Sequence, residues 1–351
     1  MSSLRRQLLS KFPAPEPLNE SDEEPSQVHG AKRRTNYSPA NWEDYFAACR
    51  NVPLNEGRDV FRVYETCASD GPLFIFHHGA GQAALSFGLT AAAMRDAAQG
   101  ACSLVAYDCR GHGHTVTEDD DDLSLTRLSD DLASIVAACR TNPSQDVILV
   151  GHSMGGAVVV DAVKRGAVSN ITGVVVLDVV EGSALESLAY MTAFVQSRPR
   201  VFKTLEAAIE WSVRSGGVHN PRSARLSVPP LLRTAGKEHA DGEQEYVWRT
   251  DLGKTAPFWE GWFKDLSGKF LGCSASKLLV LANTDRLDNP LMIGQMQGKF
   301  QLIVLQNCGH HLQEDAPDRL ASTLLEFHHR FRRLALPIKR FPISEKRADQ
   351  P

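Results

Sequence analysis

The stretch Asp146–Gly155 reads DVILVGHSMG and joins a short apolar run to the pattern G-x-S-x-G. That pattern marks a nucleophile elbow, in which a strand ends in a sharp, strained turn that exposes the serine hydroxyl. Gly151 and Gly155 are small because such a turn leaves no room for side chains beside it. A helix-like segment begins at Gly155 or Gly156. The stretch therefore predicts a strand, a tight turn and a helix, with Ser153 as a covalent nucleophile.

Apolar runs of strand length recur on both sides of this elbow and alternate with helical patterns. The strand-like runs lie at 73–76, 103–107, 173–178, 277–281 and 300–305, and the helical patterns at 85–98, 125–139 and 317–331. Such alternation is typical of a mostly parallel sheet that is covered by helices on both faces. We therefore expect an α/β fold, in which the alternating run Asp59–Glu65 (DVFRVYE) forms an edge strand.

The chain divides into five segments by composition and pattern. Residues 36–180 and 273–335 carry the α/β alternation and are expected to form the two parts of the core. Between them, 181–272 is helical or irregular, without a strand, and an insertion between late strands of such a sheet usually makes a cap that shapes substrate choice. Residues 1–35 are rich in Pro, Ser, Glu and basic residues and are expected to be disordered, and the tail 336–351 to be flexible.

Composition excludes several classes of function. The 351 residues carry a net charge of −4, which gives no general affinity for nucleic acid or for an anionic membrane. No apolar run approaches the roughly 20 residues of a membrane span, and the N-terminus lacks the apolar segment of a secretory signal. Seven scattered cysteines, an odd number without a C-x-x-C pair, indicate reduced thiols and no structural zinc site. We expect a cytoplasmic protein, with the nucleus as a second location.

A serine hydroxyl becomes a good nucleophile only when a neighbouring base takes its proton, and here we expect a histidine that a carboxylate orients. Two histidines, His310 and His311, follow the last strand-like run in the string NCGHH, and the Gly-His step favours His310. Two aspartates compete for the orienting role. Asp178 ends the strand after the nucleophile helix, and Asp285 follows the run at 277–281. Together these features predict the α/β-hydrolase fold, and its sheet topology alone favours Asp285.

The oxyanion of an acyl-transfer intermediate needs two backbone N–H donors. One is expected from Met154, the residue after the nucleophile, and the other from Ala80 in the string HHGAG at His77–Gly81. Loss of one such donor typically costs about 10²–10³ in rate. This chemistry needs neither a metal nor an organic cofactor, and none is expected.

Other residues near the expected strand ends have plainer interpretations. Trp259 and Trp262 either line a binding surface or pack in the core of the cap, since indole rings dominate burial wherever they occur. Several histidines beside glycines are interpreted as loop residues that pack, because none has partners at metal-site spacing. These are His77, His112, His114 and His152.

Longer strings extend the pattern beyond the elbow. Between about Asn36 and Phe331 the sequence resembles the protein phosphatase methylesterase-1 family, serine hydrolases that remove the methyl ester from the C-terminal leucine of the protein phosphatase 2A catalytic subunit. The strings within 181–272 distinguish this family from generic lipases and esterases. The resemblance rests on FRVY (61–64), GHSMGGA (151–157), DVVEG (178–182), AIEWSV (208–213), WEGWF (259–263), DRL (285–287), IGQMQGKF (293–300) and EDAPD (314–318).

The resemblance implies a triad of Ser153, Asp178 and His310, because the family's acid falls in the DVVEG string. Asp285 is kept as the alternative acid. The implied partner is the catalytic subunit of protein phosphatase 2A, whose C-terminal tail is the substrate. Two other functions stay open: a small-molecule serine esterase or lipase, which would turn over free esters rapidly, and a non-catalytic phosphatase-binding regulator with a dispensable triad.

Two departures from the family pattern are visible. Ala80 stands where the family has glycine, a change that a negative φ would tolerate. The polar loop Val228–Gln244 is shorter than the acidic insert of animal relatives. Partner contacts attributed to that insert are therefore not carried over to this chain.

Overall fold

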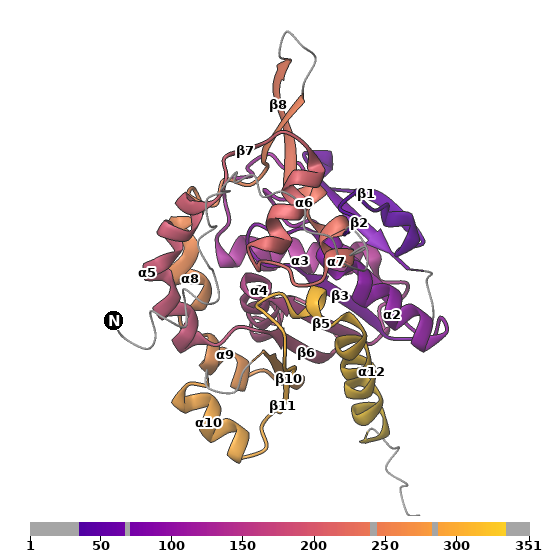
Figure 1. Ribbon diagram of the computed structural model, residues 1–351. Coiled ribbons are helices and arrows are strands. Elements are labelled where there is room, and N and C mark those ends of the chain that lie inside the picture. The colour runs from indigo at the N-terminus through magenta and orange to yellow at the C-terminus, as the bar shows by residue number, and fades with distance from the viewer. Residues whose placement is uncertain (1–34, 67–70, 239–243, 283–286, 335–351) are drawn as a thin grey trace, which may run out of the picture.

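The structure, a computed structural model, describes residues 35–66, 71–238, 244–282 and 287–334. Within these residues one central sheet has eight strands in the order β1-β2-β4-β3-β5-β6-β10-β11 (Figure 1). The β1–β2 and β2–β4 pairs are antiparallel and the other neighbours are parallel, so the expected mostly parallel sheet is confirmed. The strands are β1 Ala48–Leu54, β2 Asp59–Glu65, β3 Leu73–His77, β4 Ser103–Tyr107, β5 Val147–His152, β6 Ile171–Leu177, β10 Ser276–Leu281 and β11 Gln301–Val304.

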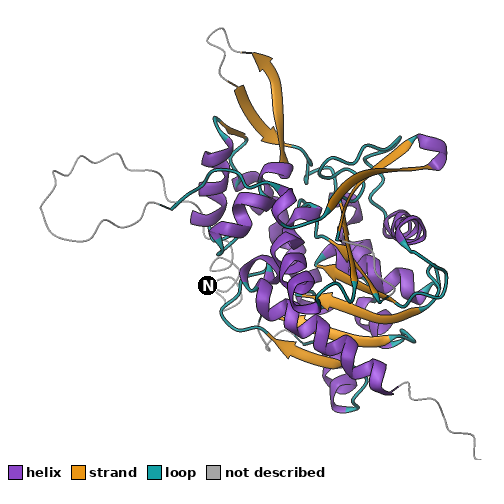
Figure 2. Ribbon diagram, turned by 90° about the vertical axis from the view of Figure 1, so that its right-hand side faces the viewer, coloured by secondary structure: helices purple, strands orange, loops and turns teal. Residues whose placement is uncertain are grey.

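Helices cover both faces of this sheet (Figure 2). They include α2 Gly88–Ala98, α3 Leu125–Cys139, α4 Met154–Lys164 and α12 Pro317–Leu334. Successive side chains of a strand point to opposite faces, so the central strands need apolar cover on each side. On β5, Leu149 packs in one buried cluster with Leu132 of α3 and Val158 of α4, whereas Ile148 packs in a second cluster with Met94 of α2. The uninterrupted apolar run before the elbow is explained by this two-sided burial.

The expected edge position of Asp59–Glu65 is wrong. This segment forms β2, the second strand, and β1 pairs outside it, with Ala48 opposite Glu65 and Leu54 opposite Asp59. The β1 sequence, ACRNVPL, has no apolar alternation, and Pro53 cannot donate a hydrogen bond to a neighbouring strand. Proline is tolerated on an edge strand, which is why this strand can form without a clear sequence signal.

The segment 181–272 contains strands, so the expectation of a strandless insertion is also wrong. β7 (Val201–Phe202), β8 (Leu232–Glu238) and β9 (Gln244–Trp248) form a separate antiparallel sheet in the order β7-β9-β8. β8 and β9 project from the body of the molecule (Figures 1 and 2). Strand β8 lies within the segment expected to be a polar loop, Val228–Gln244. A projecting hairpin buries little surface and needs little apolar patterning, so its sequence resembles that of a loop.

The helices of this segment include one that packs deep in the main core. They are α5 Glu181–Ser197, α6 Leu205–Arg214, α7 Pro221–Ser227, α8 Trp259–Phe263 and α9 Leu266–Leu271. Trp259 and Trp262 of α8 are buried in the same apolar cluster as Val158 of α4. Trp262 Nε1 also donates to the carbonyl of Leu123 at 2.7 Å. The pair is therefore buried and does not line a surface, but it packs in the main core and not in the separate core of the cap that the sequence suggested.

A buried ion pair ties the loop after β4 to helix α3, and breaking it should destabilise the fold. The Nε and Nη2 atoms of the fully buried Arg110 lie 2.9 Å from the two carboxylate oxygens of Asp131, and Nη2 lies 3.5 Å from Asp59. Arg110→Met removes the bidentate partner of the buried Asp131 and leaves Asp59 with Arg127, 3.1 Å away, so we expect the free energy of unfolding to fall by about 3–5 kcal/mol in urea denaturation. The control Arg95→Met removes an exposed pair with Asp96 and should change it by less than about 1 kcal/mol. An equally small change for Arg110→Met would contradict the prediction.

Candidate active site

Ser153 lies on the turn between β5 and α4, with φ of 53° and ψ of −119°. A positive φ is costly for a residue with a side chain and is kept only where the surroundings fix it. A Cβ on Gly151 would lie 2.1 Å from the carbonyl oxygen of Gly155, and a Cβ on Gly155 would lie 2.3 Å from the carbonyl oxygen of His77. No side chain fits at either position, which explains both glycines of the G-x-S-x-G pattern.

Asp178 and His310 meet at the carboxyl edge of the sheet. Asp178 follows β6 and is 2% exposed, and His310 lies in the loop between β11 and α11 (Leu312–Asp315). His310 Nδ1 lies 2.8 Å from Asp178 Oδ2, and the backbone N–H of Ala282 donates to Asp178 Oδ1 at 3.0 Å. Because a carboxylate can only accept hydrogen bonds, His310 Nδ1 carries the proton and Nε2 is left to act as a base.

Ser153 lies next to this pair. Its backbone N–H donates to the carbonyl of Leu177, the residue before Asp178, at 3.0 Å. The ring of the preceding residue, His152, lies 4.7 Å from the ring of His310. The Ser153 hydroxyl has no hydrogen-bond partner among the described residues, and catalytic hydrogen bonds often tighten only when substrate is bound. The structure thus brings the three residues together without joining Ser153 to His310 by a hydrogen bond.

Both expected oxyanion donors lie beside the elbow. Met154 is the first residue of α4, and the first N–H groups of a helix lack partners within it. The loop that follows β3 packs against the elbow, since a Cβ on Gly79 would lie 3.2 Å from the Cβ of Ser153. Ala80 is the next residue of this loop, and its φ is not positive, so alanine is tolerated where the family pattern has glycine.

Side chains hold the backbone groups on either side of Ala80. The N–H of Gly79 donates to Gln82 Oε1 at 3.0 Å, and the N–H of Gly81 donates to His112 Nε2 at 2.9 Å. The Ala80 N–H between them makes no hydrogen bond to any residue that the structure describes. The loop therefore keeps an unpaired N–H at Ala80, the residue expected to donate to the oxyanion.

His112 has a role in this loop that its sequence context does not reveal. Burial lowers the pKa of His112 to about 4, so its ring is neutral at pH 7. Its Nδ1 donates to the carbonyl of Arg110 at 2.8 Å, which leaves Nε2 free to accept the N–H of Gly81. The interpretation of His112 as a packing residue is thus incomplete. No spacing pattern separates it from the exposed His114, two residues further on.

His311 and Asp285 are the alternatives to His310 and Asp178 in the expected triad. The Nδ1 atom of His311 lies 3.6 Å from Glu314 Oε1 and makes no hydrogen bond to any described residue. Burial lowers the pKa of His311 to about 3, so it stays neutral at physiological pH. Asp285 lies outside the described residues.

Buried histidines should make the fold sensitive to acid. Burial lowers the pKa of five histidines strongly below the usual 6.5, and that of His114 less, so below that pH the unfolded chain binds protons that the native protein does not. The five are His77, His78, His112, His152 and His311. Each one costs about 1.4 kcal/mol of stability per pH unit as the pH falls from 6.5 toward its folded pKa.

Three buried carboxyls act in the opposite direction, because burial raises the pKa of Glu314 to about 8, that of Asp108 to about 6 and that of Asp131 above its usual value. The contribution of Glu314 is complete below about pH 4.5 and is lost as the pH rises through 8, and that of Asp108 is lost as the pH rises through 6. The five histidines outweigh these carboxyls below pH 6.5. We therefore expect the Tm, measured by differential scanning fluorimetry, to be highest near pH 6.5–7 and to fall steeply between pH 6 and 5. A Tm that is constant or rises over that interval would refute this prediction.

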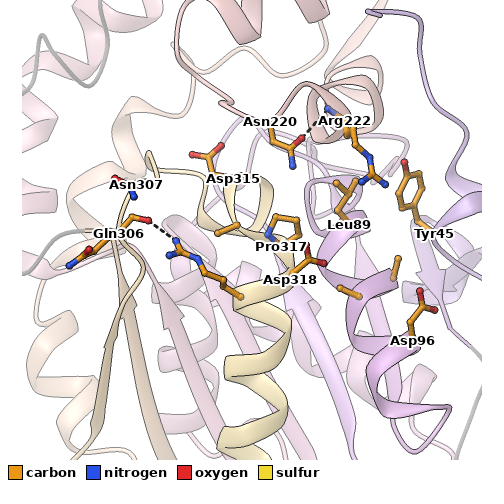
Figure 3. A pocket seen from close by; sticks show the side chains of 14 residues that line it. Tyr45, Leu89, Asp96, Asn220, Arg222, Gln306, Asn307, Asp315, Pro317 and Asp318 are labelled. Carbon is orange, nitrogen blue, oxygen red and sulfur yellow. Dashed lines mark hydrogen bonds between the residues drawn. The ribbon is translucent and has the colours of Figure 1, made fainter. Parts of the chain in front are cut away.

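A cavity of about 530 Å³ lies beside the site, between α2, α7 and the start of α12 (Figure 3). None of the three triad candidates lines it. Asp315 on its wall contacts the loop that carries His310, because its Oδ2 accepts the N–H of Gly309, the neighbour of His310, at 2.7 Å. The wall carries both Arg222 and Asp318, so it has no single charge that would select a ligand.

Three further features of the described residues concern metal ions, membrane-spanning helices and cysteines. Among the described residues, no three or more His, Cys, Asp or Glu side chains are grouped so that they could hold a metal ion. In the same part of the chain, no helix combines the length and apolar character needed to cross a membrane. The cysteines described there are free thiols.

The fold and the elbow define the class of protein. Residues 74–323 match the family model described as "Alpha/beta hydrolase family", so the chain is an α/β hydrolase. Solved structures agree on the fold at low sequence identity. E-2-(acetamidomethylene)succinate hydrolase aligns with a TM-score of 0.63 at 19% identity, over 80% of this chain and 100% of that chain. An esterase of M. tuberculosis aligns with a TM-score of 0.59 at 19% identity, over 80% and 92%.

The particular family follows from closer relatives. The chain is 38% identical to protein phosphatase methylesterase 1 of Homo sapiens, over 94% of this chain and 96% of that protein. It is 44% identical to protein phosphatase methylesterase 1 of Yarrowia lipolytica, over 86% of this chain and 75% of that protein. The chain therefore belongs to the protein phosphatase methylesterase 1 family, as the sequence strings predict.

Proposed function

We propose that this protein is a serine carboxylesterase that demethylates the C-terminal leucine methyl ester of the protein phosphatase 2A catalytic subunit. The observation that carries the proposal is the hydrogen bond of 2.8 Å between Asp178 Oδ2 and His310 Nδ1 beside a strained serine elbow. This arrangement supports acyl transfer. Family membership supports an ester of a protein phosphatase as the substrate.

In the proposed mechanism Ser153 attacks the ester carbonyl while His310 Nε2 takes the proton from its Oγ. The N–H groups of Ala80 and Met154 stabilise the oxyanion that forms. Methanol then leaves with the proton from His310, which gives an acyl-enzyme on Ser153. A water molecule, activated by His310, hydrolyses that intermediate and releases the free carboxylate. Asp178 holds the imidazole in the required tautomer and stabilises the imidazolium.

Residues 181–272 are proposed to act as a cap over this site. In support, a Cβ on Gly81 would lie 2.9 Å from Leu252 Cδ1, so the cap packs directly on the oxyanion loop. Thr250 Oγ1 also donates to the carbonyl of Gly111 at 2.8 Å. A cap in this place would select the substrate by what it admits to Ser153. The free thiols described above support the proposed cytoplasmic location.

The test is demethylation of the carboxymethylated phosphatase 2A core enzyme by the purified protein. Mass spectrometry of the C-terminal peptide of the catalytic subunit would measure loss of the methyl group. Loss of the methyl ester is the expected result. If the ester stays intact while 4-nitrophenyl acetate is cleaved, the substrate assignment is wrong and the protein is a general esterase. If neither ester is cleaved but the phosphatase is bound, the regulator hypothesis takes its place.

A further inference from the structure

We propose that Gln82 is a positioning residue for ester hydrolysis, whose carboxamide holds the oxyanion loop and, through His152, the loop that carries His310. The inference rests on the proposed hydrolysis by Ser153. Gln82 lies just after the oxyanion loop, is 7% exposed and contacts neither Ser153 nor His310 through a hydrogen bond. Its effect on the reaction would therefore be exerted through other residues.

The carboxamide oxygen of Gln82 has two contacts on the catalytic side. Oε1 accepts the N–H of Gly79 at 3.0 Å, which fixes the peptide before the free N–H of Ala80. The same oxygen lies 2.7 Å from Nδ1 of His152, the residue before the nucleophile. A single amide group thus contacts both the oxyanion loop and the elbow.

His152 extends these contacts to the general base. Its Nε2 lies 2.8 Å from the carbonyl oxygen of His310, so the ring bridges Gln82 Oε1 and the backbone of the catalytic loop. Both of these oxygens are acceptors, and a neutral imidazole has one N–H to donate. Burial lowers the pKa of His152 well below its usual value, so the neutral ring donates a hydrogen bond to one of these oxygens and contacts the other through its unprotonated nitrogen. The ring itself, packed between the two oxygens, links the positions of the two loops.

The other end of the Gln82 carboxamide reaches the cap. Gln82 Nε2 donates to Glu314 Oε1 at 3.4 Å, and the hydroxyl of Ser227, at the end of α7, donates to the second oxygen of Glu314. The backbone carbonyl of Glu314 also accepts from the Ser223 hydroxyl at 2.9 Å and from Asn220 Nδ2 at 3.0 Å. Helix α7 of the cap is therefore joined through Glu314 and Gln82 to the oxyanion loop.

The expected loss of kcat is set by how strongly catalysis depends on the exact positions of the groups that Gln82 holds. The Ala80 N–H and His310 Nε2 interact most strongly with charge that develops in the transition state. A displacement of such groups by about 1 Å can cost about 10²-fold in rate while ground-state binding is largely kept. Gln82→Met keeps the side-chain length but removes every hydrogen bond of the carboxamide. We expect its kcat to fall about 10- to 100-fold, with KM within about threefold of the wild type.

The chain offers a matched control and a conservative variant. Gln313 is also a fully buried glutamine, and its amide N and O atoms have no hydrogen-bond partner among the described residues. Gln313→Met should therefore leave kcat unchanged. Gln82→Glu keeps an acceptor oxygen for Gly79 and His152 and should retain a higher kcat than Gln82→Met. Thermal unfolding of each variant would measure the folded fraction by which kcat is corrected.

The experiment measures kcat and KM for 4-nitrophenyl acetate and for a methyl-esterified C-terminal phosphatase peptide. A fall in kcat at nearly constant KM for Gln82→Met, partial recovery in Gln82→Glu and an unchanged Gln313→Met would support the inference. The inference is overturned if Gln82→Met keeps the wild-type kcat, if Gln82→Glu is as slow as Gln82→Met, or if Gln313→Met loses as much. A wild type inactive on both esters would overturn the proposed function, and this inference with it.

Discussion

Ser153→Ala should reduce kcat for the methyl ester by about 10⁴ or more, because it removes the atom that forms the acyl-enzyme. The Ala80 and Met154 N–H groups stay in place, so a residual rate above that of water is expected. The measurement is release of the methyl group from the phosphatase peptide, followed by mass spectrometry. In the described structure the Ser153 hydroxyl makes no hydrogen bond, so its removal should leave the fold unaffected.

The control for this variant is Ser322→Ala, which removes an exposed hydroxyl on α12 and should leave the rate unchanged. If Ser153→Ala keeps more than about a tenth of the wild-type kcat, Ser153 is not the nucleophile. A variant that loses hydrolysis but still binds the phosphatase would show that binding and catalysis are separable. That result would be compatible with an enzyme that also acts as a regulator.

The parts of the fold that the sequence predicts are those set by local sterics and by burial on both faces. The elbow is an example, because the contacts that exclude side chains from Gly151 and Gly155 lie within the motif and the adjacent strand β3. The buried strands β3, β4 and β5 likewise appear as apolar runs, since both of their faces are covered. These features need little knowledge of distant contacts.

The missed features are strands with little apolar pattern of their own and single polar contacts. β1 pairs with the next strand, β2, and β8 pairs with the next strand, β9, but neither β1 nor β8 shows apolar alternation that would reveal it. His112 holds Gly81 from 31 positions away, and Gln82 meets His152 across 70 positions. One hydrogen-bonding side chain has no periodicity, so no sequence window can reveal these contacts.

Sequence alone also does not show whether Asp178 or Asp285 is the acid that orients His310. A pair of variants can distinguish the two residues. β6 and β10 are neighbouring parallel strands, with Leu177 opposite Val280. Their ends therefore lie side by side, and an acid that follows either strand could reach the same histidine. The backbone at Asp178 reinforces this proximity, since its N–H donates to the carbonyl of Val280 at 2.8 Å. The strand order admits an acid at either position, and the contact between Asp178 and His310 favours Asp178.

We expect Asp178→Asn to lower kcat by about 10⁴, because asparagine keeps the shape of the side chain but favours the wrong tautomer of His310. Asp285→Asn is the matched control, in a residue outside the described part of the chain, and should stay within about tenfold of the wild type. Both are measured by kcat on 4-nitrophenyl acetate, with thermal unfolding to check the fold. A large loss in Asp285→Asn alone would assign the acid to Asp285. Asp178 would then be a residue that holds the end of β6 against β10 through its bond to the N–H of Ala282.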